Sequence, residues 1–130
     1  MTGAVKAYWD TLNETLPKEK AVVELFRRLV CTLEQAGAAI ERRDVPVAHR
    51  NLVAAQEVVA GLAASLDPRA GELADNLAQL YAYIGDLLVQ ANLRKERAPV
   101  EEAVNLLQVL LSGWEGAAQK DTSRLKRSSA

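Results

Sequence analysis

The sequence predicts an all-α protein, an antiparallel up-down-up-down four-helix bundle with a short N-terminal helical cap segment. Apolar residues recur at spacings of three and four along four long stretches, which is the period of an amphipathic helix. The connections between these stretches are short, so consecutive helices must run antiparallel. Of the 130 residues, 49% are hydrophobic and only 5% are aromatic, which indicates a core of Leu, Val and Ala, mostly good helix formers.

Residues 1–17 are predicted to form the cap segment. Positions 4–13 fit one short amphipathic helix with Tyr8, Trp9 and Leu12 on one side, and Pro17 interrupts the pattern. Helices of this length are marginal in isolation. The segment is therefore either packed permanently on the bundle or acts as a detachable flap.

The bundle itself is predicted over residues 18–119, and its first two helices over residues 18–43 and 45–66. Asp44 is a capping residue and Pro46 suits the first turn of the second helix. The apolar stripes of these two helices are Val22, Phe26, Leu29, Leu33, Ala36 and Ile40, then Ala48, Leu52, Ala55, Val59, Leu62 and Leu66.

The third stretch, residues 65–95, has the longest uninterrupted helical pattern, and Asp67 followed by Pro68 is a helix-start signal. The fourth helix is predicted to start at Pro99. Beside its main stripe, the third stretch has a second apolar set, so this helix needs more than one neighbour, or one neighbour and a guest. The main stripe comprises Leu73, Leu77, Leu80, Ile84, Leu87 and Ala91.

Charge is distributed unevenly along the chain. The formal net charge is −1, which gives no reason to expect nucleic acid or a membrane as a partner. Residues 120–130 contain four cations and one acid, and we expect a disordered basic tail there. Such a tail is either a solvated end or a contact for anionic surfaces.

The sequence contains no recognisable constellation for catalysis or metal binding. His49 is the only histidine and Cys31 the only cysteine, so a disulfide within the chain and a usual zinc site are both excluded. We expect His49 at the surface and Cys31 as a small buried hydrophobe. No signal peptide or apolar run of membrane-spanning length is present. We therefore expect a cytoplasmic protein that is not an enzyme and has no cofactor.

The third stretch resembles the signature region of the FliS family of flagellar secretion chaperones. The matching residues are Ser65, Leu66, Asp67, Gly71, Glu72, Asn76, Leu77, Leu80, Tyr81, Tyr83, Ala91, Asn92 and Lys95. Trp114 stands at the family's usual tryptophan position, and the similarity covers most of the chain. One departure is Phe26-Arg27-Arg28, where family members usually have Tyr-Asp-Gly.

This resemblance implies a helical bundle that binds newly made flagellin in the bacterial cytosol. Family members hold the disordered C-terminal segment of flagellin in apolar grooves, prevent its premature polymerisation and deliver it to the flagellar type III export gate. By the resemblance, Tyr8 would cover the empty groove. The other expected groove residues are Asn76, Tyr83 and Asn92, to which we add the apolar Leu80, Ile84 and Leu88.

Two alternatives remain open at this point. Arg27 and Arg28 replace an acid and a glycine, which is compatible with a divergent paralogue that binds another export or regulatory protein. The same apolar faces could instead support self-association, as a homodimer or a structural bundle.

Overall fold

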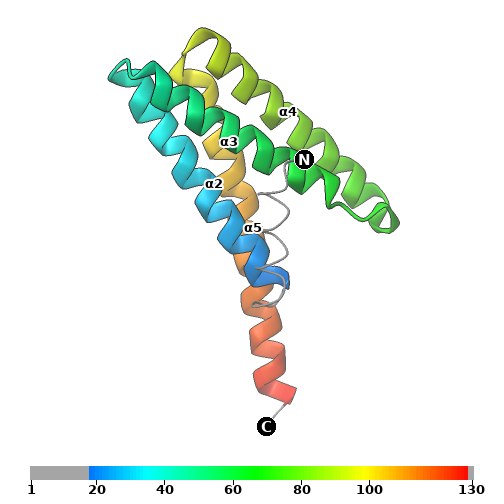
Figure 1. Cartoon of the computed structure of the whole chain (residues 1–130). Coiled ribbons are helices and arrows are strands. Elements are labelled where there is room, and N and C mark those ends of the chain that lie inside the picture. Colours follow the sequence, from blue (N-terminus) through cyan, green and yellow to red (C-terminus); the bar gives the residue numbers. More distant parts are fainter. Residues whose placement is uncertain (1–17, 129–130) are drawn as a thin grey trace.

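The computed structural model describes the backbone of residues 18–128 and the packing of side chains from residue 21 to residue 113. The described part is all-α (Figure 1), as predicted. It comprises α2 (Lys18–Glu41), α3 (Val45–Ala64), the 3₁₀ turn η1 (Pro68–Ala70), α4 (Glu72–Arg94) and α5 (Arg97–Ser128). The predicted cap segment, residues 1–17, lies outside the described residues.

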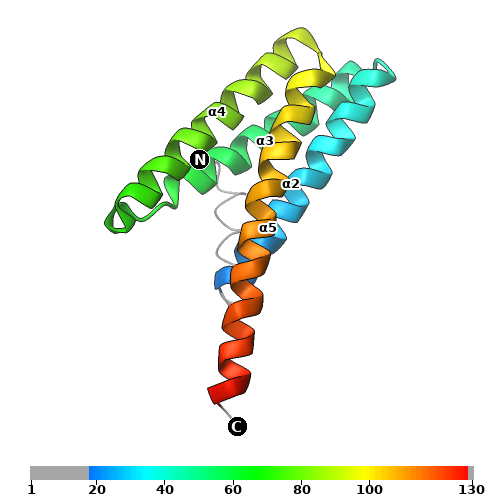
Figure 2. The same ribbon diagram turned by 180° about the vertical axis from the view of Figure 1, so that it is seen from behind.

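The helices are arranged in a ring of four neighbours. Helix α2 packs against α3 and α5, and α4 packs against the same two helices, whereas the diagonal pairs make no backbone contact. Figures 1 and 2 show the arrangement from opposite sides. Because the connections are short, successive helices alternate in direction, and the predicted antiparallel four-helix bundle is confirmed.

The core lies along the axis of this ring and is almost entirely aliphatic. Across the centre, where the diagonal helices α2 and α4 do not touch through their backbones, Phe26 meets Tyr81 with ring centroids 6.5 Å apart. Such tilted aromatic pairs are favourable packing geometries. The largest fully buried side chains are Phe26, Leu33, Leu52, Ile84, Leu88, Leu107 and Val100.

The turn between α2 and α3 follows the sequence prediction. Asp44 is the N-cap of α3, and its Oδ1 accepts a hydrogen bond from the backbone N–H of Val47 at 3.4 Å. Pro46 stands in the first turn, where its missing N–H costs nothing. Arg43 has a positive φ of 59°, which ends the preceding segment and reverses the chain.

The start of the third helix differs from the prediction. Asp67 does cap a turn, since its Oδ1 accepts from the N–H of Arg69 at 2.9 Å, but that turn is the separate η1. The chain then redirects at Gly71, whose φ of 63° and ψ of −127° are available to glycine, and α4 begins at Glu72. The long helix that was expected to start at Asp67 and Pro68 therefore begins about one turn later.

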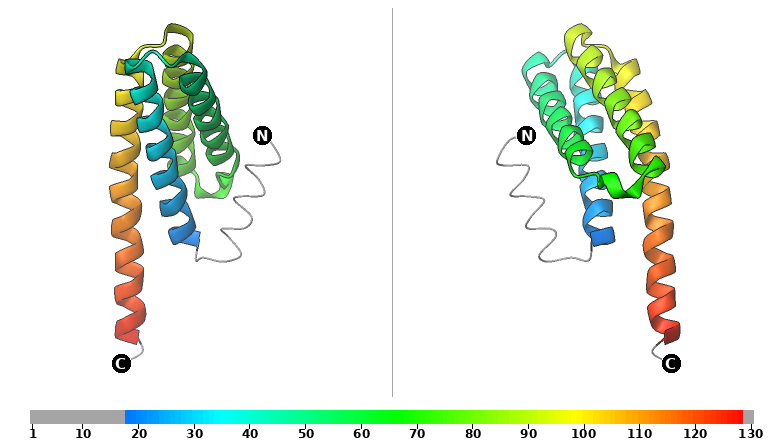
Figure 3. Two further views of the ribbon diagram at one scale, coloured as in Figure 1. Left: turned by 60° about the vertical axis from the view of Figure 1, so that its left-hand side comes forward. Right: turned by 90° about the vertical axis from the view of Figure 1, so that its right-hand side faces the viewer.

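The longest helix is α5 rather than α4, with 32 residues against 23. In Figure 3 its C-terminal part extends beyond the ends of the other three helices. Its backbone stays helical to Ser128, where the sequence predicted a disordered tail from residue 120. No proline follows Pro99, so the sequence contains no proline that would break α5 after its start. A domain boundary at residue 119 stays a prediction.

Candidate functional site

Three of the predicted groove residues lie on one side of α4. Asn76, Leu80 and Tyr83 are spaced four and three residues apart and therefore share a face. The Tyr83 hydroxyl donates a hydrogen bond to the carboxylate of Glu102, which places this face beside α5. That hydrogen bond raises the pKa of Tyr83 above its usual value. Asn76 is exposed and Leu80 is half-buried, so both have surface to offer a partner.

Ile84 and Leu88, also predicted as groove residues, lie in the core of this structure. Both are fully buried among the core side chains and have no exposed surface in this arrangement. They project toward the bundle axis because α4 turns the Ala74–Tyr81–Leu88 face inward, together with Ile84 and Ala91. They therefore support the surface from beneath rather than line a groove.

Asn92 points to the opposite side of α4, toward α3. Its carboxamide Nδ2 lies 3.0 Å from Nδ1 of His49, and its Oδ1 lies 3.2 Å from the same atom. The ammonium group of Lys95 donates to the backbone carbonyl and to the side chain of Asn92. Lys95 itself has a left-handed backbone conformation at the C-terminus of α4. In this structure Asn92 therefore joins two helices and fixes a helix end.

An apolar pocket of about 200 Å³ opens at the end of the bundle where η1 connects α3 to α4. Leu73, one of its lining residues, belongs to the predicted main stripe of this helix and is 61% exposed. Leu77 is half-buried and continues the apolar surface along α4 toward Leu80. The pocket is lined by Val22, Leu62, Ser65, Leu66, Asp67, Ala70, Leu73, Ala74, Leu77 and Tyr81.

Sequence reasoning missed this pocket, because it placed Leu73 and Leu77 on the apolar stripe of the third helix without locating where that stripe reaches the surface. The sequence did show that α4 has more apolar residues than one neighbouring helix can cover. It did not show which of these residues are exposed. We call the surface formed by Leu73, Asn76, Leu77, Leu80 and Tyr83 the α4 face.

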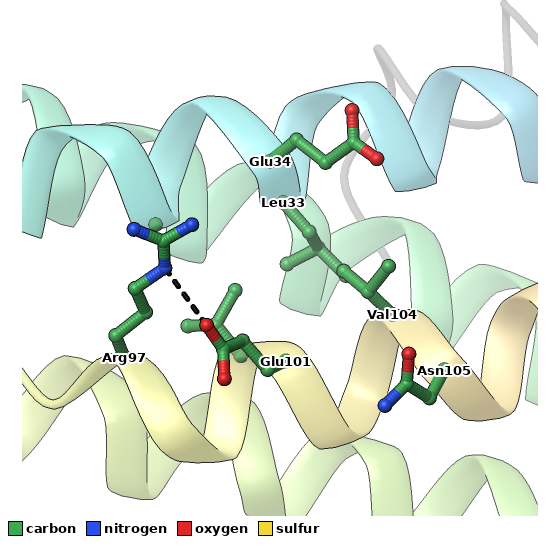
Figure 4. A pocket seen from close by; sticks show the side chains of 8 residues that line it. Leu33, Glu34, Arg97, Glu101, Val104 and Asn105 are labelled. Atoms are coloured by element: carbon green, nitrogen blue, oxygen red, sulfur yellow. Dashed lines mark ion pairs between the residues drawn. The ribbon is translucent and has the colours of Figure 1, made fainter.

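A second cavity, of about 360 Å³, lies between α2 and α5 (Figure 4). Its floor is apolar, from Leu33, Val100 and Val104. At its rim, Arg97 pairs with Glu101 at 3.0 Å and also with Glu41 of α2. The guanidinium is thus already neutralised by two carboxylates, and these exposed pairs tie the start of α5 to the end of α2.

The remaining reactive side chains do not form a catalytic group. Cys31 is exposed, in contrast to the predicted burial, because it lies on the α2 surface opposite Leu29 and Leu33. The carboxamide Nε2 of Gln35 lies 3.7 Å from the sulfur of Cys31. Among the described residues, no group of three or more His, Cys, Asp and Glu side chains could hold a metal ion.

Tyr8 lies outside the described residues, so its position relative to the α4 face is a prediction only. Within the described residues, no helix combines the length and the apolar character needed to span a membrane. What the fold and the site define is a helical binding module, in which an open apolar surface adjoins a closed aliphatic core.

Comparison with known proteins identifies the family to which this helical bundle is similar. The model of the family described as "Flagellar protein FliS" matches residues 1–121. The chain is 39% identical over 85 residues to the flagellar secretion chaperone FliSB of Pseudomonas aeruginosa, covering 65% of this chain and 68% of that protein. It is 35% identical over 122 residues to flagellar secretion chaperone FliS of Salmonella typhimurium, covering 89% and 90%. The Vibrio cholerae FliS is 25% identical over 120 residues, 88% of each chain.

The chain therefore belongs to the FliS family of flagellar secretion chaperones. The resemblance in the signature region is thus confirmed. The family is one of chaperones and not of enzymes, in agreement with the expectation drawn from the sequence.

Proposed function

We propose that this protein binds the disordered C-terminal segment of flagellin in the bacterial cytosol, prevents its premature polymerisation and delivers it to a component of the flagellar export gate. The observation that supports this most is the open apolar α4 face in a member of the FliS family. Leu73 is 61% exposed beside an apolar pocket and continues through Leu77 and Leu80, and contiguous apolar surfaces of this kind are where partners bind.

The α4 face suits a segment that folds as it binds. Leu73, Leu77 and Leu80 are spaced four and three residues apart, so they present one continuous apolar ridge. An amphipathic helix buries its own apolar side chains against such a ridge, in helix-in-groove recognition. Because a disordered segment must be ordered on binding, the net affinity is moderated and release at the export gate stays feasible.

The proposed contacts differ from those expected from the sequence. Asn76, Leu80 and Tyr83 remain candidates, and Leu73 and Leu77 join them. Ile84 and Leu88 act from the core, and Asn92 acts through the α3–α4 contact. Tyr8, in the predicted cap segment, is the residue that we expect to cover the α4 face when no client is bound.

The first test is a calorimetric titration with a C-terminal flagellin peptide of about forty residues, enough for two or three helices, with helix content followed by circular dichroism. We expect binding with a gain of helix. Leu73→Gln should weaken binding about tenfold, or about 1.4 kcal/mol, because the peptide no longer buries that leucine. Leu93→Gln is the matched control, since Leu93 is 80% exposed on another side of α4 and should leave binding unchanged.

Two results would count against this proposal. Equal losses for the two variants would mean that the peptide does not use the α4 face. No binding at all would redirect the search to another client, which the exposed Arg27 and Arg28 favour. In that case the double change Arg27→Asp and Arg28→Gly should restore flagellin binding if this pair sets client choice.

A further inference from the structure

The cavity between α2 and α5 has no part in the proposed function. Its floor is closed and apolar, since Leu33 is 0% and Val100 is 2% exposed. Gly37, which faces Val100, has no side chain, so the floor stays wide. The volume of about 360 Å³ lies within the range of about 300–1,000 Å³ that is usual for ligand sites. The cavity shares no residue with the α4 face, so an occupant here does not depend on the proposed client.

The rim of this cavity carries more negative than positive charge. Arg97 is already paired with two carboxylates, those of Glu41 and Glu101. A third carboxylate, that of Glu34, has no hydrogen-bond or ion-pair partner among the described residues. The carboxamide of Asn105 is also unpaired within that part of the chain. One guanidinium therefore stands against three carboxylates at this rim.

The two unpaired polar groups lie at the same end of the cavity. Figure 4 shows Glu34 on α2 and Asn105 on α5, both away from the Arg97–Glu101 ion pair. The apolar side chains of Leu33 and Val104 lie between them. This end of the cavity therefore combines an apolar surface with a carboxylate and a carboxamide oxygen that have no donor.

A basic side chain matches this combination. Arginine and lysine have an aliphatic stem, which can cover Leu33 and Val104, and a cationic head that donates several hydrogen bonds. An apolar side chain would fill the floor but would cover the Glu34 carboxylate without pairing it, which costs free energy. An anionic side chain would be repelled by the same carboxylate. Of these classes, only a cation satisfies both the floor and the rim.

We propose that the α2–α5 cavity binds a basic side chain, arginine or lysine, of a protein partner. The source is a protein because the chain belongs to a family of chaperones. The cationic head pairs with Glu34 and with the carboxamide oxygen of Asn105, and the stem lies against the apolar floor. The Arg97–Glu41 pair already ties α5 to α2 at the other end, so the site exists before the partner arrives.

An NMR titration of the isotope-labelled full chain with N-acetylarginine amide at low salt tests this site. We expect chemical-shift changes centred on residues 33–37 and 100–105, with a dissociation constant of about 1 mM for a ligand of this size. N-acetylcitrulline amide has the same shape without the charge and should bind at least about fivefold more weakly. Raising the salt concentration should weaken binding of the arginine probe only.

Two variants connect the binding to the cavity. Glu34→Gln changes an exposed residue and should weaken binding of the arginine probe about fivefold. Asp86→Asn, on the exposed side of α4, is the matched control and should leave binding unchanged. Gly37→Ala should narrow the cavity and weaken binding at least about twofold. Its added Cβ would lie 3.8 Å from Cγ1 of Val100, which is not a clash, and alanine favours the helix, so the fold is retained.

A blocked alanine-rich peptide with one central arginine separates a protein side chain from a free small molecule. It should bind at least as tightly as the arginine probe, because only the side chain enters the cavity. Weaker binding of this peptide would overturn the proposal, as would the absence of shift changes at residues 33–37 and 100–105. Equal affinity for the arginine and citrulline probes would mean that the charge is not recognised. Equal losses for Glu34→Gln and Asp86→Asn would mean that the probe responds only to the net charge of the protein.

Discussion

Phe26, where the resemblance to the FliS family implies a tyrosine, lies in the core. Its side chain is fully buried and contacts Tyr81 across the centre of the bundle. A hydroxyl at this position would need a buried partner, which phenylalanine does not require. The two arginines that follow are exposed, so of these three substituted positions they are the ones that a partner can contact.

Tyr81, the other ring of this pair, predicts a pH dependence of stability. It is 3% exposed, and desolvation by burial raises its pKa from 10.0 to about 12. Between these two values the unfolded chain releases the tyrosine proton while the folded chain keeps it. The stability present in full below pH 10 is therefore lost as pH rises toward 12, by about 2–3 kcal/mol.

Tyr81→Phe cannot ionise, so its free energy of unfolding should fall less steeply over this range. Urea unfolding at a series of alkaline pH values measures the difference from the wild-type chain. Tyr83→Phe is the control, since the pKa of Tyr83 is raised in the same direction by Glu102 but the side chain is solvent-accessible. A larger effect for Tyr83→Phe than for Tyr81→Phe would show that burial at position 81 is not the cause.

At the scale of the element, the start of α4 depends on Gly71. Its φ of 63° and ψ of −127° define a backbone conformation that is strained for residues with a Cβ. Gly71 is held in this conformation because η1 ends directly before it and α4 begins directly after it. A Cβ at this position would meet no atom within 4 Å, so any cost of substitution is a backbone cost.

Gly71→Ala should therefore lower the free energy of unfolding by about 1–3 kcal/mol. Gly85→Ala should raise the free energy of unfolding by about 0.5–1 kcal/mol, because Gly85 lies inside α4, where alanine favours the helix, and its added Cβ also meets nothing within 4 Å. Chemical denaturation of both variants checks the opposite signs. Equal effects would mean that the conformation at Gly71 is not constrained.

The helices were predictable because each has a strong apolar period and, in α3, a capping residue with a nearby proline. The start of α4 was not, since Asp67 and Pro68 are equally good signals for a 3₁₀ turn and for an α-helix. The conformation of Gly71, which decides between them, depends on how η1 and α4 pack. The helical backbone of α5 up to Ser128 was not predictable for a different reason, because a polar composition does not distinguish a solvated helix from a disordered chain.

At the scale of the whole molecule, the candidate site was only partly predictable. Helical period alone puts Leu73, Ile84 and Leu88 on one broad apolar surface, whereas the structure exposes the first and buries the other two. That difference depends on which side of α4 its neighbours cover. Likewise, the partner of Asn92 is His49, 43 positions earlier, which no local pattern reveals.

The close approach of the four helices depends on alanines at their contacts. Enlarging one of these alanines should therefore destabilise the bundle. Ala36, Ala48, Ala55, Ala91 and Ala103 are all fully buried, so small side chains occupy the inner faces of the four α-helices. Ala55→Leu inserts three carbon atoms where there is no room. It should destabilise the bundle by about 1–3 kcal/mol and force α3 away from its neighbours.

Ala54→Leu provides the matched control, since the adjacent Ala54 is exposed on the same helix. It should change stability by no more than about 0.5 kcal/mol. Thermal and urea unfolding of both variants measure the difference, and hydrogen exchange shows whether α3 alone or the whole ring loosens. Because every helix in the ring contacts two neighbours, we expect Ala55→Leu to reduce protection in α2 and α4 as well as α3. Loss of protection confined to α3 would instead mean that α3 opens independently of the ring.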